Sequence, residues 1–519
     1  MTKKRTFAVN ALSAALGGCQ IIAETPAGRS QAGRRLAGTS RRASARDRPG
    51  GLFCLILLLI CGTGLAAQQS DILIKLTQGD RPVIAVIDFR GAAGAADHMG
   101  VLNQTLFGDL ESSGLLKMAA KAMYPLEVPQ RPEDFKAPLP PAPASSANQR
   151  GKKKGRAPVP EEPPKPVRQG PWLTDWSAPP VSANYLVFGY AAVQGDQIVL
   201  FGWLYNVTQP NVAAAHVLGK RYFGAVDAAG AQRVAHEFAA DIIAQFGGKT
   251  LLNSKIYFVS DRTGSKELWS MDPDGSNQKR LTSYNSISIM PAVSPDGTKI
   301  AFTSFAKGNP AIYIHSAETG RRLPFYNQVA SMNATPDFTP DGKEVLYSST
   351  ASGYAQIYAA GVDGGNLRRI STSRAIEVEP KVNPKNQSEM VFVSGRSGPQ
   401  QIYKMNLDGA NVERLTSGEG EASNPAWHPD GQLIAFAWTR GFEPGNFNLF
   451  LMDVASRRVD QLTHGAGRNE NPSWAPDGRH LVFSSNRGGS SQIWTMLADG
   501  TQLQQLTTQG RNSTPVWGK

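Results

Sequence analysis

Apolar and polar positions in the second half of the chain repeat with a period of about 45 residues. Each copy opens on a proline followed by a short strand, continues through a tight turn, and adds apolar strands such as "KIAFTS" (299–304) and "AIYIHS" (311–316). Four short antiparallel strands per period of this length are typical of a β-propeller blade. A stacked solenoid is the alternative, but solenoid periods normally contain helical or parallel-strand patterns that this segment lacks. The prolines are Pro291, Pro336, Pro380, Pro425, Pro472 and Pro515, with gaps of 45, 44, 45, 47 and 43 residues.

The turn after the first strand is Pro-Asp-Gly in four copies, at 295–297, 340–342, 429–431 and 476–478. Glycine permits the positive φ that tight hairpins require. The third copy has "PKNQ" (384–387) instead. We therefore expect the third turn to be the least ideal of the set.

The two ends of the repeat region are complementary in phase. "KIYFVSDR" (255–262) matches a second strand, whereas "STPVWGK" (513–519) matches a first strand. Pairing the C-terminal strand with the strands that begin the region would close a ring of six blades without an open sheet edge. Trp427, Trp474 and Trp517 recur at one position of the repeat, which predicts packing between blades.

The first half of the chain predicts a small α+β domain within residues 68–249. A buried strand is expected at 82–89 and a helix from about Ala95 to Glu111. Two strands, 184–193 and 197–207, are joined by Gly195 and Asp196, and a third strand is expected at 216–225. A helix follows at 231–248, with Val234, Phe238, Ile242 and Phe246 at helical spacing and a stop at Gly247.

Proline and lysine dominate residues 125–180, which include "KAPLPPAPASSANQRGKKKGRAPVPEEPPKP". Such a composition buries too little apolar surface to offset the entropy of ordering, so we expect a disordered insertion inside the α+β domain. A basic tether for an anionic envelope surface is the other interpretation.

Residues 1–67 predict an export segment. "GLFCLILLLICGTGLAAQ" (51–68) has too few apolar residues to span a bilayer and ends in small residues, with cleavage expected after Ala67. All three cysteines precede residue 68, so the mature protein would be free of thiols, as suits an oxidising compartment. An upstream false start codon would explain the first 45 residues equally well.

The formal net charge of +12 is local rather than spread over the chain. Residues 1–67 carry +8 and residues 131–168 carry +5, so the rest is close to neutral. A nearly neutral body does not attract a polyanion over a broad surface, which argues against nucleic-acid binding.

The sequence gives no catalytic constellation. It contains no G-x-S-x-G elbow, its seven histidines never fall at metal-ligand spacing, and "MDPDGSN" (271–277) lacks the distal glutamate of a calcium loop. We therefore expect no enzyme activity, cofactor or metal site. The alternative class is a secreted propeller that binds glycan or acts as a propeller-type peptidase or hydrolase.

A propeller offers a channel mouth, lined here by the residues that precede each proline. This set is rich in amides and hydroxyls, which suits hydrogen bonding to a polypeptide or glycan. The candidate partner-binding residues are Met332, Asn333, Thr335, Val378, Glu379, Ser423, Asn424, Asn469, Glu470, Asn512 and Thr514.

The export segment, the domain containing "VIAVIDF", the "IKLTQGDRP" stretch (74–82) and six WD40-like repeats of the "PxWxPDGxxIAFxS" kind together resemble the TolB family of the Tol-Pal envelope system. The resemblance covers about 69–519 except for the Pro/Lys insertion. It implies a non-enzymatic, monomeric periplasmic adaptor, without stable membrane insertion, that supports outer-membrane integrity and constriction at division.

The resemblance also implies two partners. The peptidoglycan-associated lipoprotein Pal would bind at the channel mouth, at positions that map by motif to Met332, Thr335, Val378 and Glu379. The inner-membrane-anchored protein TolA would bind the mature N-terminus at 68–77, through Asp71, Ile72 and Ile74.

Overall fold

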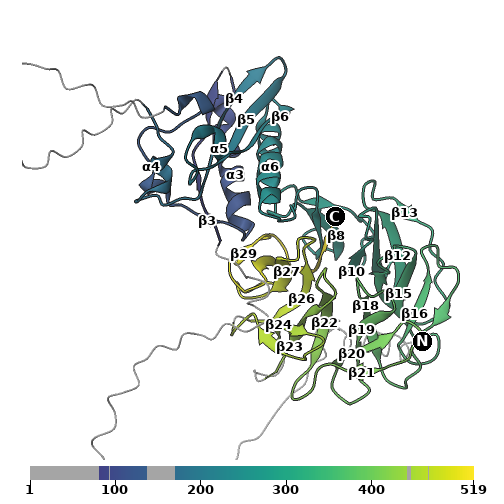
Figure 1. Ribbon diagram of the computed structural model, residues 1–519. Helices are drawn as coiled ribbons and strands as arrows, with labels where there is room; N and C mark the ends of the chain where they lie inside the picture. The colour runs from purple at the N-terminus through teal and green to yellow at the C-terminus, as the bar shows by residue number, and fades with distance from the viewer. Residues whose placement is uncertain (1–80, 93, 137–169, 441–445, 466) are drawn as a thin grey trace, which may run out of the picture.

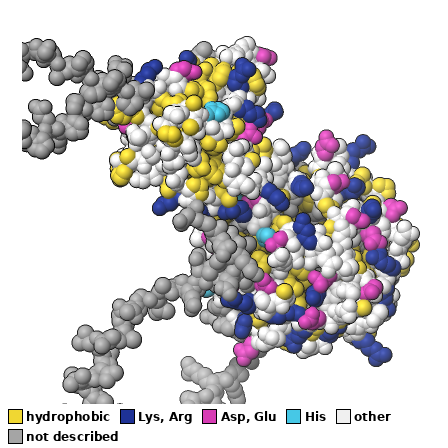
Figure 2. Space-filling model, viewed as in Figure 1, with side chains coloured by type: hydrophobic (Ala, Val, Ile, Leu, Met, Phe, Trp, Pro, Cys, Tyr) yellow, Lys and Arg dark blue, Asp and Glu magenta, His cyan; other side chains and the backbone are white. Residues whose placement is uncertain are grey.

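The computed structural model describes residues 81–92, 94–136, 170–440, 446–465 and 467–519. An α+β domain and a six-bladed β-propeller lie side by side, as Figure 1 shows. The predicted fold class is therefore confirmed. Figure 2 shows many hydrophobic side chains on the visible face of the α+β domain, whereas charged side chains of both signs are scattered over the propeller.

The α+β domain is built on a mixed sheet with the strand order β3-β1-β4-β5-β6, to which β2 adds beside β4. Strands β1, β3 and β4 run parallel, whereas β4, β5 and β6 form an antiparallel meander. The elements are β1 (Val83–Val86), β2 (Arg90–Ala92), η1 (Ala96–His98), α3 (Met99–Ser112), β3 (Lys117–Met118), η2 (Lys121–Met123), η3 (Pro132–Asp134), α4 (Thr174–Ser177), β4 (Tyr185–Gln194), β5 (Gln197–Asn206), α5 (Val212–Ala215), β6 (His216–Ala225) and α6 (Ala228–Gln245).

Helix α6 lies close to one face of the meander because two glycines leave room for it. A Cβ at Gly202 would lie 2.6 Å from the Phe238 ring, and a Cβ at Gly224 would lie 2.6 Å from the Gly230 carbonyl oxygen. The helix begins three residues before the predicted start because Asp227 caps it, its side chain accepting a 2.6 Å hydrogen bond from the Gly230 amide.

The predicted disordered segment, 125–180, extends too far at both ends. Residues 125–136 and 170–180 are structured, because apolar side chains at their ends enter the domain core: Phe135, Leu173 and Trp176 are all buried. Phe135 lies edge-on to Phe188 of β4 at 5.5 Å between ring centroids. The centre of the insertion, 137–169, and the export segment lie outside the described residues.

Each blade is an antiparallel sheet of four strands in sequence order, and the sixth blade joins both ends of the repeat region. That blade has the order β30-β7-β8-β9, with Trp517 opposite Ile256 and Ser513 opposite Val259, so the predicted closure is present. The other strands are β10 (Ser288–Val293), β11 (Lys299–Ser304), β12 (Ala311–Ser316), β13 (Arg322–Leu323), β14 (Asn333–Phe338), β15 (Glu344–Ser349), β16 (Gln356–Gly361), β17 (Arg368–Arg369), β18 (Glu377–Val382), β19 (Glu389–Ser394), β20 (Gln401–Asn406), β21 (Glu413–Arg414), β22 (Ala422–Trp427), β23 (Leu433–Trp438), β24 (Asn448–Asp453), β25 (Val459–Gln461), β26 (Asn469–Trp474), β27 (His480–Ser485), β28 (Gln492–Leu497) and β29 (Gln504–Gln505), with the closing blade formed by β30 (Asn512–Gly518), β7 (Lys255–Ser260), β8 (Glu267–Met271) and β9 (Lys279–Arg280).

The turn between the first and second strands of the third blade differs from the corresponding turns of the glycine-containing copies, as its sequence predicts. Gly297, Gly342, Gly431 and Gly478 have φ between 68° and 75°, whereas no residue between Pro384 and Ser388 has a positive φ. The side chain of Asn383 stabilises this turn instead, by accepting hydrogen bonds from the amides of Lys385 and Asn386 at 2.9 and 3.1 Å.

Candidate functional site

Six residues, one per blade, line the central channel immediately before the prolines. All six have positive φ, and the pairing register of the innermost strand shifts at each of them. A β-bulge of this kind bends the strand and redirects its side chains. We call this set the girdle: Met290, Thr335, Glu379, Asn424, Asn471 and Thr514.

Hydrogen bonds between girdle residues connect consecutive blades at three of the six junctions. The Glu379 amide donates to the Thr335 hydroxyl at 3.3 Å, and both carboxylate oxygens of Glu379 accept from Asn424, one from its amide at 2.7 Å and one from its side chain at 3.0 Å. The Asn471 amide then donates to the Asn424 side-chain oxygen at 3.3 Å. The girdle side chains therefore satisfy the backbone of the next blade.

Glu379 is the acidic residue of the girdle, and the pKa of its carboxyl is shifted. It is 7% exposed, and burial raises the pKa of its carboxyl to about 7, although the bonds from Asn424 and the nearby Lys381 ammonium act to lower it. Burial also raises the pKa of Glu470, against the opposing effect of Arg468, which binds it at 2.7 Å. Both carboxyls thus belong to the propeller interior and are already engaged by neighbouring side chains.

A cavity of about 410 Å³ occupies the half of the channel between the girdle and the turns that join first and second strands. Four predicted site residues line it: Thr335, Glu379, Asn424 and Thr514. Its wall includes an ion pair between adjacent blades, with the Lys381 ammonium 2.8 Å from the Asp337 carboxylate.

Trp427, Trp474 and Trp517 also border this cavity but are 6–9% exposed. Trp427 donates through Nε1 to the Lys381 carbonyl of the preceding blade at 3.0 Å. The predicted role of these residues in packing between blades is confirmed.

The opposite, mouth half of the channel is apolar on the first three blades. Met332 and Val378 are 1% exposed and form part of a hydrophobic cluster with Ile289 and Ala334. The partly exposed members of this cluster define what we call the mouth crescent: Ile287, Met290, Phe305 and Ile376.

The predicted amide residues of the mouth face inward rather than toward a partner. Asn333, Asn469 and Asn512 are at most 3% exposed, as is Ser423, and each of the three asparagines donates to a backbone oxygen of the loop before it. These residues shape the loops because a buried amide requires hydrogen-bond partners.

Three arginines that were not predicted from the sequence lie just after second strands and bind the start of innermost strands at the mouth. Arg262, Arg396 and Arg487 each stack over an aromatic ring at 4.5–5.1 Å and each bond the first residue of an innermost strand. Their signal in the sequence was the repeated Ser-x-Arg at 260–262, 394–396 and 485–487.

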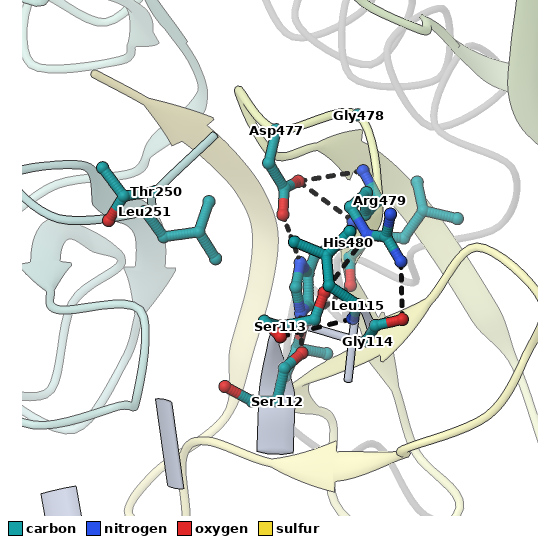
Figure 3. A network of polar contacts seen from close by, with 12 residues as sticks. Ser112, Ser113, Gly114, Leu115, Thr250, Leu251, Asp477, Gly478, Arg479 and His480 are labelled. Carbon is teal, nitrogen blue, oxygen red and sulfur yellow. Dashed lines mark hydrogen bonds and ion pairs between the residues drawn. The ribbon is translucent and has the colours of Figure 1, made fainter. Parts of the chain in front are cut away.

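The structure also brings together two segments that the sequence left unrelated, the end of α3 and the turn of the fifth blade (Figure 3). Arg479 donates to the carbonyls of Ser113 at 3.1 Å and Gly114 at 2.6 Å, and His480 Nε2 lies 2.7 Å from the Ser112 carbonyl oxygen. Asp477 holds the other ring nitrogen of His480 at 2.7 Å. The terminal carbonyls of a helix lack intrahelical partners, so the propeller caps α3 from outside.

Arg479 and His480 could have been found by comparing the repeats. The corresponding pairs in the other turn-containing copies are Thr298-Lys299, Lys343-Glu344, Ser388-Glu389 and Gln432-Leu433, so only the fifth copy has Arg-His.

Asp71, Ile72 and Ile74, the predicted TolA-facing residues, lie outside the described residues. Within the described ranges, no three His, Cys, Asp or Glu side chains are arranged to hold a metal ion. Over the same ranges, no helix combines the length and apolar character needed to cross a bilayer.

Comparison with known proteins identifies the repeat region. The family model described as "TolB beta propeller domain" matches residues 245–441 and 416–519, which together exceed half of the chain. A protein named TolB homolog from Chlorobium chlorochromatii is 36% identical over 142 residues, covering 27% of this chain and 31% of the relative. The Tol-Pal system protein TolB of Roseobacter denitrificans is 28% identical over 287 residues, covering 54% of this chain and 55% of the relative.

The chain thus spans between about a third and about half of these curated relatives. The crystal structure of TolB from Acinetobacter baumannii superposes with a TM-score of 0.65 at 23% identity, covering 85% of this chain and 97% of that one. At this identity the superposition shows a shared fold for both domains.

Proposed function

The chain belongs to the TolB β-propeller family, and on that premise we propose that it is a non-enzymatic periplasmic adaptor of the Tol-Pal envelope system. In this role it binds a Pal-like peptidoglycan-associated lipoprotein at the channel mouth. It binds TolA through residues 68–77 and thereby supports outer-membrane integrity and constriction at cell division.

The mouth crescent is the observation that supports the lipoprotein site. Ile287 and Ile376 immediately precede innermost strands and Phe305 follows a second strand, so all three lie around one end of the channel. Partly exposed apolar side chains gathered at one end of a channel favour protein association. Met332 and Val378, two of the residues predicted from the sequence, are buried in the same hydrophobic cluster as the crescent.

The test is the affinity of the mature chain for the soluble domain of the Pal-like lipoprotein, measured by calorimetry. Ile376→Glu places a charge in the crescent and should weaken binding at least tenfold. Val412→Glu is the matched control, because Val412 is 40% exposed in a hairpin away from the mouth. Wild-type affinity in the Ile376→Glu variant would refute the site.

The TolA arm is tested separately. Deleting residues 68–77 should abolish TolA capture while leaving the Pal-like lipoprotein affinity unchanged. Replacing Ile72 and Ile74 by Ser should reproduce the loss, and unchanged TolA capture would remove the arm from the proposal.

A further inference from the structure

The face of the meander opposite α6 has a line of aromatic side chains. The cross-strand pairs Phe188–Trp203 and Tyr190–Phe201 lie on this face, since the intervening Gly202 faces the helix. Phe223 of β6 lies on the same face opposite Val199 and is 46% exposed. We call Tyr190, Phe201, Trp203 and Phe223 the aromatic ledge.

Three of the ledge rings, those of Tyr190, Phe201 and Trp203, are stacked and partly exposed. Tyr190 and Phe201 stack at 4.7 Å with 9° between ring planes, and Phe188 and Trp203 at 5.7 Å with 20°. Trp203 leans toward Gly219, where a Cβ would lie 2.8 Å from its Cδ1 atom. Exposed rows of aromatic rings are the surface that polyproline II segments recognise, because proline rings pack against aromatic rings.

The described residues on either side of the proline-rich insertion lie beside this ledge. Phe135 packs against Phe188 and stacks on Tyr205 at 5.9 Å, and the Lys136 amide donates to the Pro171 carbonyl at 3.3 Å. The chain therefore departs and returns at one point of the aromatic face. The residues that follow Lys136 are "APLPPAPA" (137–144), with no charged side chain.

We propose that the tract 137–144 docks on the aromatic ledge as a polyproline II segment of the same chain. Eight residues in this conformation span about 25 Å, and three neighbouring strands span only about 10 Å, so the tract reaches across β4, β5 and β6. Docking of a tethered segment needs little intrinsic affinity because its effective concentration is high.

Charge indicates which half of the insertion docks. Arg131 stacks over Tyr190 at 4.6 Å, and Arg221 lies opposite Phe201 in the neighbouring strand. Two arginines beside the ledge would repel "KKKGR" (152–156), whereas the uncharged tract 137–144 avoids this repulsion. This docking is independent of the proposed lipoprotein and TolA sites.

The test uses the full mature chain labelled with 5-fluorotryptophan, with the Trp203 resonance assigned from a Trp203→Phe variant. Replacing Pro138, Pro140, Pro141 and Pro143 by Ser should shift that resonance toward the position of a more solvated indole. The matched control replaces Pro158, Pro160, Pro163 and Pro164 by Ser and should leave the resonance in place. A peptide spanning residues 135–146, added to the first variant, should restore it.

An unchanged Trp203 resonance in the first variant would overturn the proposal. So would an equal shift in both variants, because that would remove the distinction between the halves. A resonance that moves only with protein concentration would assign the ledge to a second copy of the chain, which also contradicts the docking proposed here.

Discussion

His480 Nε2 lies 2.7 Å from the carbonyl oxygen of Ser112, across the boundary between the two domains and 368 residues away in sequence. Its other ring nitrogen faces the Asp477 carboxylate. Both partners are hydrogen-bond acceptors, so the His480 imidazole bridges the turn of the fifth blade and the end of α3. Together with Arg479, this residue fixes the α3 terminus on the fifth blade.

Arg479→Ala should loosen the contact between the domains. It leaves the Ser113 and Gly114 carbonyls without their donor, at a cost of about 1–3 kcal/mol for charge-assisted bonds. Differential scanning calorimetry should then resolve a separate transition for the α+β domain. Gln432→Ala, at the corresponding position of the fourth blade, serves as the control and should retain the wild-type profile.

Gly114→Ala should destabilise the same contact by a steric route. Gly114 has φ of 64°, and a Cβ there would lie 2.8 Å from the Leu497 Cδ1 atom. Backbone strain and overpacking together predict a loss of at least about 1 kcal/mol in the free energy of unfolding of the α+β domain, measured by urea titration. Gly195→Ala is a useful comparison because its φ is also 64° but no atom lies within 4 Å of the added Cβ. Equal losses would show that strain alone is responsible.

Glu379 predicts a pH dependence of propeller stability. Its pKa is raised from 4.5 to about 7, so the folded state retains a proton that the unfolded state releases between these values. The free energy of unfolding should therefore fall as pH rises from about 4.5 to about 7, by at most about 3 kcal/mol. Glu379→Gln cannot release this proton and should flatten that part of the profile, measured by chemical denaturation at several pH values. A variant profile parallel to the wild type would contradict the assignment.

Removing β30 should unfold the propeller as a whole. A chain ending at Gly510 exposes β7 as an open edge and leaves Ser254 without the Trp517 indole, whose Nε1 lies 3.0 Å from the serine oxygen. We expect loss of the cooperative thermal transition followed by circular dichroism. Trp517→Phe keeps the strand but removes the hydrogen bond and part of a buried ring, so it should lower stability by about 1–3 kcal/mol and leave the transition cooperative. A cooperative transition in the truncated chain would refute closure as the source of propeller stability.

The regular part of the fold could be predicted because its information is local and repeated. A proline, a turn glycine and an apolar strand recur at fixed spacing, and the phase of residues 255–262 against 513–519 sufficed to predict the closing blade. The third turn was also predictable, since a tight turn without glycine makes the left-handed conformation costly.

The candidate site was harder to predict because burial depends on neighbours distant in sequence. Glu379 and Asn333 looked available as polar residues of a channel mouth, yet the adjacent blade engages the former and its own loop engages the latter. The boundaries of the insertion failed for a related reason. Phe135 and Trp176 are isolated apolar residues in polar segments, and only the tertiary structure supplies the cavity that each one fills.

The six girdle residues share a left-handed backbone conformation but differ in side-chain type. The positive φ and the bulge at this position belong to the backbone of each blade, and they recur whichever side chain is present. Met290, Thr335, Glu379 and Asn424 already show four different chemistries on one backbone conformation. A duplicated blade can therefore acquire a new lining residue at this position without a change in the backbone conformation that presents it to the channel.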